Sequence, residues 1–170
     1  MISSIISFPL GQILLAKTEK GLCLAHYSKT QKSIRQAEER IAKEGFSIAT
    51  DNTAFKNEHE LFNQYFNGQR VDFSEIPVHF IFGTPYQQNI WKEAAKIPYG
   101  KTETYKSLSL KMNHNGFRSA GQALSKNPLI IVVPCHRVLA EGGVGGFSAG
   151  LPLKKFLLEL ENIPYPAQPA

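Results

Sequence analysis

Residues 117–138 of the 170-residue chain, FRSAGQALSKNPLIIVVPCHRV, join a helical pattern to an apolar run that ends in a thiol, an imidazole and a guanidinium. The run Leu129–Val133 is continuous and mostly β-branched, which predicts a strand covered on both faces. Pro134 lacks a backbone N–H and should end that strand. We therefore expect Cys135 to stand at the end of a short buried strand, with His136 beside it.

Two short helices are expected before this run. The first covers 104–112 and can be capped by Thr104, and the second covers 117–126, after the polar turn 113–116. Two short helices joined by a tight turn are the pattern of a helix-turn-helix element, which we place at about 104–126. An ordinary helical hairpin has the same pattern, so both interpretations stay open at this point.

Helices are also expected on either side of this element. Thr84 as N-cap, Pro85 at the first helical position and Gln87 as the capping-box partner predict a helix that begins at Pro85. After the glycine-rich loop 141–150, the segment 151–161 has an amphipathic pattern. Its expected inner residues are Leu153, Phe156, Leu157 and Leu160.

The first half of the chain has a different pattern of apolar and polar residues. Residues 2–27 alternate short apolar runs with turn-like pairs, which predicts an antiparallel meander. Helices are expected at 30–44 and 57–66, and 71–76 is interpreted as a linker. We therefore expect an α/β (α+β) protein of two domains. The first, 1–77, combines a sheet with helices, and the second, 78–170, is mostly helical with a short strand that carries Cys135.

The composition limits the kind of protein. The chain is long enough for a hydrophobic core, and its two cysteines, Cys23 and Cys135, do not form a disulfide framework or a cysteine zinc module. The N-terminal stretch lacks a basic region and is interrupted at Pro9 and Gly11, so we expect no signal peptide or spanning helix and a cytoplasmic protein with a free thiol. The formal net charge of +5 favours an anionic partner such as nucleic acid.

The chemistry of Cys135 depends on what removes its proton, because the thiolate is the nucleophile. Adjacent side chains in an extended segment point to opposite sides, so a bridging water is an easier route to His136 than direct contact. Glu159 or Glu161 could orient the imidazole and stabilise its protonated form. An inert buried thiol remains the alternative.

Helix 117–126 carries the small residues Ser119, Ala120, Gly121 and Ala123. Small residues let a helix approach a nucleic-acid groove closely, and Arg118 supplies a cation for phosphates or a wedge into the base stack. Packing against another helix explains the small residues equally well.

These residues resemble the O6-alkylguanine-DNA alkyltransferases, which repair guanine by direct reversal. The resemblance covers Pro85 to Glu161 through PYQQNIWKEAAKIPYGKTETY, FRSAGQALSKNP, VVPCHRV and GGVGGFSAGLPLKKFLLELE. In the first half it is carried chiefly by FPLGQILLA. The family implies a ribonuclease H-like first domain, a winged helix-like second domain and a cysteine S-methyltransferase that flips the target base, reacts once and needs no cofactor or metal.

The resemblance also implies roles for single residues. Cys135 takes the alkyl group from guanine O6, His136 deprotonates it through a water, and Glu161 holds His136. Tyr105 contacts the neighbouring phosphate and the base, and Arg118 fills the hole left by the flipped nucleotide. The resemblance assigns the remaining DNA contacts to Ser119, Ala120, Gly121 and Gln122. It assigns the substrate pocket to Leu124, Val138 through its carbonyl, Val144, Phe147, Ser148 and Lys154, of which Ser148 and Lys154 stabilise the leaving guanine. Asn127 and Arg137 are implied to be structural.

One position of this sequence departs from the family's usual pattern. Ala149 stands where the family often has glycine, and its methyl group is expected to narrow the pocket against bulky adducts. Cys135 argues against the related damage sensors, which lack that cysteine. The spacing of Cys23, His26, His59 and His79 does not indicate a metal site.

The expected partner is double-stranded DNA that contains O6-alkylguanine, with no membrane, and we expect a monomer. In a prokaryote the protein would be associated with the nucleoid, and in a eukaryote it would be nuclear. A cysteine hydrolase that uses Cys135 with a histidine and a DNA-binding regulator with an inert thiol are the competing functions.

Overall fold

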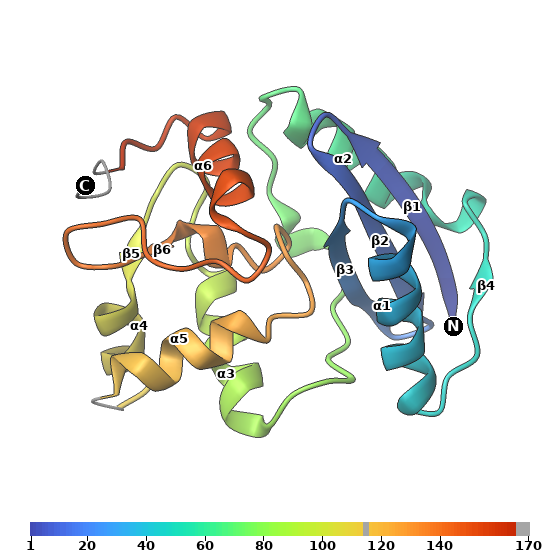
Figure 1. Ribbon diagram of the computed structural model, residues 1–170, viewed down its shortest axis with the longest axis horizontal. Coiled ribbons are helices and arrows are strands. Elements are labelled where there is room, and N and C mark those ends of the chain that lie inside the picture. Colours follow the sequence, from blue (N-terminus) through green and yellow to red (C-terminus); the bar gives the residue numbers. More distant parts are fainter. Residues whose placement is uncertain (114–115, 166–170) are drawn as a thin grey trace. The chain divides into compact units, whose positions relative to one another are not determined.

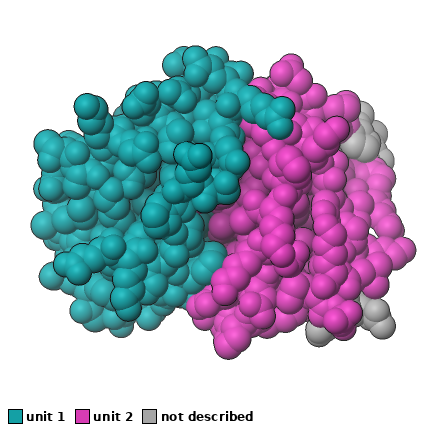
Figure 2. Space-filling model, turned by 180° about the vertical axis from the view of Figure 1, so that it is seen from behind, with its two compact units in different colours: residues 1–82, 128–130 teal, residues 83–127, 131–170 magenta. Residues whose placement is uncertain are grey.

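The first half of the chain forms a four-stranded sheet with helices. The computed structural model describes residues 1–113 and 116–165, so the turn residues His114 and Asn115 of the predicted helix-turn-helix lie outside the described residues. Two compact units are present, one made of 1–82 with 128–130 and the other of 83–127 with the residues from 131 onward (Figure 2). The first unit therefore extends to Phe82, beyond the expected boundary at 77.

The predicted meander is confirmed. Strands β1 (Ile2–Phe8), β2 (Gly11–Thr18) and β3 (Gly21–Ser28) are antiparallel neighbours, and β4 (Ala49–Thr50) adds to β1 in parallel, which gives the order β3-β2-β1-β4 (Figure 1). The two predicted helices are α1 (Gln31–Lys43) and α2 (Lys56–Phe66).

Both faces of the sheet are covered. On β2, Leu14 and Ala16 pack in one cluster with Ile34 and Ile41 of α1. The alternate residues of β2, which point to the opposite face, are equally buried. Four buried residues in a row on β2 therefore reflect a strand between two layers.

The segment 71–76 is not a linker, and that expectation is wrong. Val71, Phe73 and Ile76 are buried, and Phe73, in the 3₁₀ turn Phe73–Glu75, packs with the ring of Phe62 at a centroid distance of 5.0 Å. The chain then bonds back to β3, since Leu22 N–H donates to Pro77 O at 2.7 Å. The polar residues between the apolar ones hid this core segment in the sequence.

The second unit is built from helices around one short pair of strands. The capping box predicts α3 (Pro85–Ala95) correctly, with Thr84 and Gln87 exchanging both bonds. Helices α4 (Tyr105–Lys111) and α5 (Phe117–Ser125) follow as expected, and Trp91 Nε1 on α3 donates to Ala123 O on α5 at 2.8 Å. The strands β5 (Glu103–Thr104) and β6 (Val138–Leu139) pair in parallel.

The predicted strand 129–133 is wrong. Leu129 makes only an isolated bridge to Ala25, and Ile131 has a φ of 73°, outside the extended region. Cys135 lies instead in the 3₁₀ turn Cys135–Arg137. All five side chains of the apolar run are nonetheless buried, so the run predicted burial correctly and the conformation incorrectly.

The last helix is α6 (Leu151–Leu160), as expected. Its buried residues are Leu153, Lys154, Leu157 and Leu158, whereas Phe156 and Leu160, both expected to face inward, are partly exposed. The buried face of α6 therefore includes Lys154, which the apolar pattern did not indicate. No helix within the described residues is long and apolar enough to cross a bilayer.

Candidate active site

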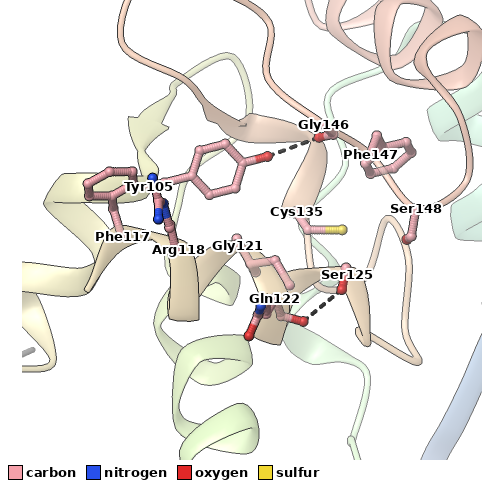
Figure 3. A pocket seen from close by; sticks show the side chains of 11 residues that line it. Tyr105, Phe117, Arg118, Gly121, Gln122, Ser125, Cys135, Gly146, Phe147 and Ser148 are labelled. Carbon is pink, nitrogen blue, oxygen red and sulfur yellow. Dashed lines mark hydrogen bonds between the residues drawn. The ribbon is translucent and has the colours of Figure 1, made fainter.

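A pocket of about 600 Å³ in the second unit opens onto Cys135 (Figure 3). Helices α4 and α5, the 3₁₀ turn and the loop before α6 supply its walls. The lining residues are Tyr105, Phe117, Arg118, Gly121, Gln122, Leu124, Ser125, Cys135, Gly146, Phe147 and Ser148. Cys135 is only 4% exposed, so its sulfur is accessible from this pocket and hidden from the rest of the surface.

A buried ionic network begins at His136, the residue after the thiol. Glu161 Oε1 contacts His136 Nε2 at 2.7 Å, and Arg137 binds the same carboxylate through Nε and Nη2 at 2.8 and 3.0 Å. Gly100 N–H donates to Oε2 at 3.1 Å. Burial alone would raise the pKa of Glu161, but the hydrogen bonds from His136 and Arg137 and the charge of Arg137 outweigh it and lower the pKa to about 2. Glu161 is therefore an ionised acceptor.

The ionised carboxylate fixes the tautomer of His136. Burial lowers the pKa of this imidazole in spite of Glu161, so the ring is neutral at rest. Since Glu161 can only accept, Nε2 carries the ring proton and Nδ1 carries the lone pair. Of the two carboxylates considered from sequence, Glu159 is exposed and accepts a bond from Tyr165, which leaves Glu161 as the partner of His136.

Asn127 contacts the reactive sulfur directly. Its Nδ2 donates to Cys135 Sγ at 3.1 Å and to Val133 O at 3.0 Å. Burial raises the pKa of Cys135, while the Asn127 bond and the charge of Lys154 lower it. Because burial is the largest of these effects, the resting group is a thiol, and a nucleophilic attack requires a base to remove its proton.

Replacing Asn127 with alanine should therefore raise the pKa of Cys135 further. One donor to the thiolate is lost, and leaving Val133 O unsatisfied is expected to lower the free energy of unfolding by about 1–3 kcal/mol. The pKa can be read from the rate of iodoacetamide labelling of Cys135 against pH, with Ser125→Ala, an exposed change at the same pocket, as the control. An unchanged pH profile would contradict the assignment of the Asn127 bond.

The carbonyl of Gly146 holds the loop over the pocket. Tyr105 Oη donates to it at 2.9 Å and Lys154 Nζ at 3.1 Å, and the same Nζ donates to Val138 O at 2.7 Å. Burial raises the pKa of Tyr105 to about 12 and lowers that of Lys154 to about 8. Gly145, with a φ of 73°, is required here because a Cβ would lie 2.8 Å from the Tyr105 ring.

The structure brings together only some of the residues expected to form the pocket. Leu124, Phe147 and Ser148 line it, whereas Val144 is fully buried in a cluster with Leu139 and Leu158. Val138 and Lys154 are fully buried and bonded to each other, so direct contact of either with a ligand would require the loop to move. Ala149 is not among the lining residues, so the expectation that its methyl group narrows the pocket is not supported.

Of the residues expected to contact DNA, some are exposed at the pocket and others are buried. Arg118 and Gln122 are exposed at the pocket, and Gly121 lines it. Ser119 is partly buried and bonded to Tyr86 Oη at 2.9 Å. Ala120 is fully buried, because this side of α5 packs inside the unit, so its side chain has no surface for DNA.

Three lining residues were not singled out from the sequence: Phe117, Ser125 and Gly146. An aromatic residue placed directly before Arg118, where a helix begins, was the available signal for Phe117. Two of the residues considered as metal ligands make side-chain hydrogen bonds with distant residues: His79 Nδ1 lies 2.9 Å from Thr18 Oγ1, and His59 Nε2 lies 2.7 Å from Ser4 Oγ.

Family models of known proteins match both halves of the chain. Residues 85–163 match the DNA-binding domain of 6-O-methylguanine DNA methyltransferase and residues 1–80 its ribonuclease-like domain. The methylated-DNA–protein-cysteine methyltransferase of Sulfolobus acidocaldarius is 34% identical over 96% of this chain and 94% of its own, and that of Saccharolobus solfataricus is 36% identical over 93% of each.

Solved structures are similar as well. OGT from Mycobacterium tuberculosis in complex with DNA superimposes with a TM-score of 0.80 at 29% identity, over 95% of this chain and 92% of that one. The O6-methylguanine methyltransferase structure from the same organism gives 0.77 at 30% identity, over 94% and 91%. The resemblance and the two-part α/β fold expected from the sequence are confirmed, and the chain belongs to the 6-O-methylguanine DNA methyltransferase family.

Proposed function

We propose that this protein repairs DNA by transferring the alkyl group of O6-alkylguanine to Cys135. The observation that carries the proposal is a nearly buried sulfur facing a pocket, with a buried histidine–glutamate–arginine network that begins at the next residue, His136. The names of the relatives, and the DNA complex of one of them, support DNA as the substrate.

The proposed reaction is a displacement at the alkyl carbon. Sγ of Cys135 forms a bond to that carbon while the bond from carbon to guanine O6 breaks, and the electron pair of that bond remains on the base. The thiol proton passes through a water to Nδ1 of His136, because Nε2 is engaged by Glu161. The carboxylate stabilises the imidazolium, and the proton is then returned to the departing guanine.

Base flipping follows from the burial of the sulfur. An exposed fraction of 4% for Cys135 means that no carbon inside a stacked duplex can reach Sγ in line. The guanine must be extruded into the pocket, at a cost of a few kcal/mol that is smaller for a damaged, weakly paired base. This difference contributes to selectivity for lesions.

The product explains why the protein should act once. Sulfur attack forms a thioether, which lacks the acidic leaving group that makes a thioester easy to hydrolyse. The chemistry is complete without a metal or organic cofactor. We therefore expect one alkyl group per protein molecule and no turnover.

An oligonucleotide with radiolabelled O6-methylguanine tests the proposal. Label should move to the protein at no more than one equivalent, and intact mass should rise by one methyl group. Repeated turnover of an ester or peptide would favour a cysteine hydrolase instead. Binding of DNA without transfer would favour a regulator with an inert thiol.

Replacing Arg118 with alanine should slow repair of duplex DNA by about 10- to 100-fold, because the side chain that compensates for the unstacked base is lost. Reaction with free O6-methylguanine base should change by less than about twofold, since that reaction needs no flipping. Lys126→Ala is the matched control, because it removes an exposed cation at the other end of α5 that does not line the pocket. Equal slowing with both substrates would remove the wedge role of Arg118.

A further inference from the structure

The side chain of Phe117 is exposed to solvent, although it is large and apolar. Phe117 is the first residue of α5 and is 54% exposed, a fraction that, among the large apolar side chains of residues 1–113 and 116–165, only Leu110 on α4 matches. The other ten phenylalanines, all within the described residues, are buried or partly buried. Phe117 and the equally exposed Leu110 line one hollow, and a groove bordered by exposed apolar side chains is a candidate binding surface.

The ring borders two hollows. It lines the pocket that contains Cys135, and with Tyr105 it also lines a neighbouring hollow of about 530 Å³ that does not contain Cys135. Figure 3 shows Phe117 beside Arg118 at one end of the pocket, with the thiol toward the other. Phe117 therefore lies on the outer rim of the pocket, at the exposed surface of α4 and α5.

Successive residues of a helix point about 100° apart, so Phe117 and Arg118 cannot occupy the same space in a base stack. A guanidinium can fill a vacated base position and bond to the orphaned partner. A flat apolar ring is suited instead to stacking on the face of a base. Phenylalanine is also one of the side chains that DNA-bending proteins insert between base steps. If an extruded guanine enters the pocket past this rim, the ring lies beside the nucleotides that flank it.

We propose that Phe117 is a stacking residue for DNA, whose ring packs on the nucleotide that flanks the extruded guanine while Arg118 fills the vacated position. This inference rests on the proposed function. Stacking on the flipped guanine itself is disfavoured, because the base has to reach Sγ and Phe117 is shared with a hollow that lacks the thiol. The ring lowers the cost of extrusion by replacing a base–base contact with a base–phenylalanine contact.

The test compares Phe117→Ala with the unmodified protein on three substrates: duplex DNA carrying O6-methylguanine, the same single strand, and the free base. We expect transfer from duplex to be slowed about tenfold, from the single strand less, and from the free base by under about twofold. Phe117→Trp, which retains a stacking ring, should restore most of the duplex rate. Because the ring is half exposed, the thermal unfolding midpoint should change little.

Leu110→Ala is the matched control. Leu110 has the same exposed fraction and lines the outer hollow but not the Cys135 pocket, so its loss should leave the duplex rate within about twofold. Equal slowing by Leu110→Ala, an unaltered duplex rate in Phe117→Ala, or slowing on all three substrates alike would each overturn the stacking role. Absence of transfer by the unmodified protein would instead remove the proposed function, and this inference with it.

Discussion

Replacing Cys135 with alanine is expected to abolish transfer of the methyl group to the protein, a loss on the order of 10³-fold or more. No other group at the pocket forms the new bond in the proposed reaction, and His136 can only move the proton. DNA binding should persist, because Arg118 and Gln122 lie on the exposed side of α5 and the sulfur is 4% exposed. Intact mass spectrometry after incubation with damaged duplex measures the first effect, and a gel shift measures the second.

Cys23 provides the matched control. It is the other cysteine of the chain, is fully buried in the first unit, and has a pKa that burial also raises. Its side chain bonds to Thr18 and to Gly21 O. Cys23→Ala should accept one methyl group per molecule like the unmodified protein. Methyl uptake by Cys135→Ala, or its loss in Cys23→Ala alone, would mean that the acceptor has been misassigned.

The sequence predicts well those features that depend on local chemistry. The exchange of bonds between Thr84 and Gln87 is a contact within one turn, and it starts α3 as expected. The meander is marked by glycines and apolar alternation that need no distant partner. Cys135 and His136 adjoin in sequence, so their proximity was certain before any fold was known.

Features that depend on distant contacts were less predictable. The run before Pro134 is apolar because it is buried, and burial does not by itself distinguish a strand from the turn that a φ of 73° at Ile131 produces. Lys154 could not be expected inside the core without knowing that Val138 O and Gly146 O would face its ammonium group. The exposure of Phe117 likewise depends on which face of α5 packs against α3 and α4.

Glu161 shows how one side chain serves both stability and the proposed chemistry. It neutralises the buried guanidinium of Arg137 and holds the proton on Nε2 of His136 at the same time. Arg137 also donates to Ile97 O at 2.6 Å, so its position is fixed from a second side. The network is therefore a rigid support on which the basic nitrogen of His136 is held.

Glu161→Gln is expected to lower the free energy of unfolding by about 3–5 kcal/mol at neutral pH, because it leaves the charge of Arg137 buried without its partner. Methyl transfer, measured well below the unfolding midpoint, should slow by about 100-fold, because the imidazolium loses its stabilising carboxylate. Glu159→Gln is the same chemical change two residues earlier at an exposed position and should leave both quantities nearly unaltered. Comparable losses in the two variants would show that the effect does not arise from the buried network.

The pH dependence of stability separates the ionic role of Glu161 from its packing. The folded pKa of about 2 lies below the ordinary value of 4.5, so the unfolded chain binds more protons between these two values. The stabilisation is therefore complete above pH 4.5 and is lost as the pH falls toward 2, an effect of about 3 kcal/mol from this group. Urea unfolding at a series of pH values should show this loss in the unmodified protein and in Glu159→Gln. Glu161→Gln has no such proton to bind and should show a correspondingly flatter profile; a profile parallel to that of the unmodified protein would mean that Glu161 is not ionised in the folded state.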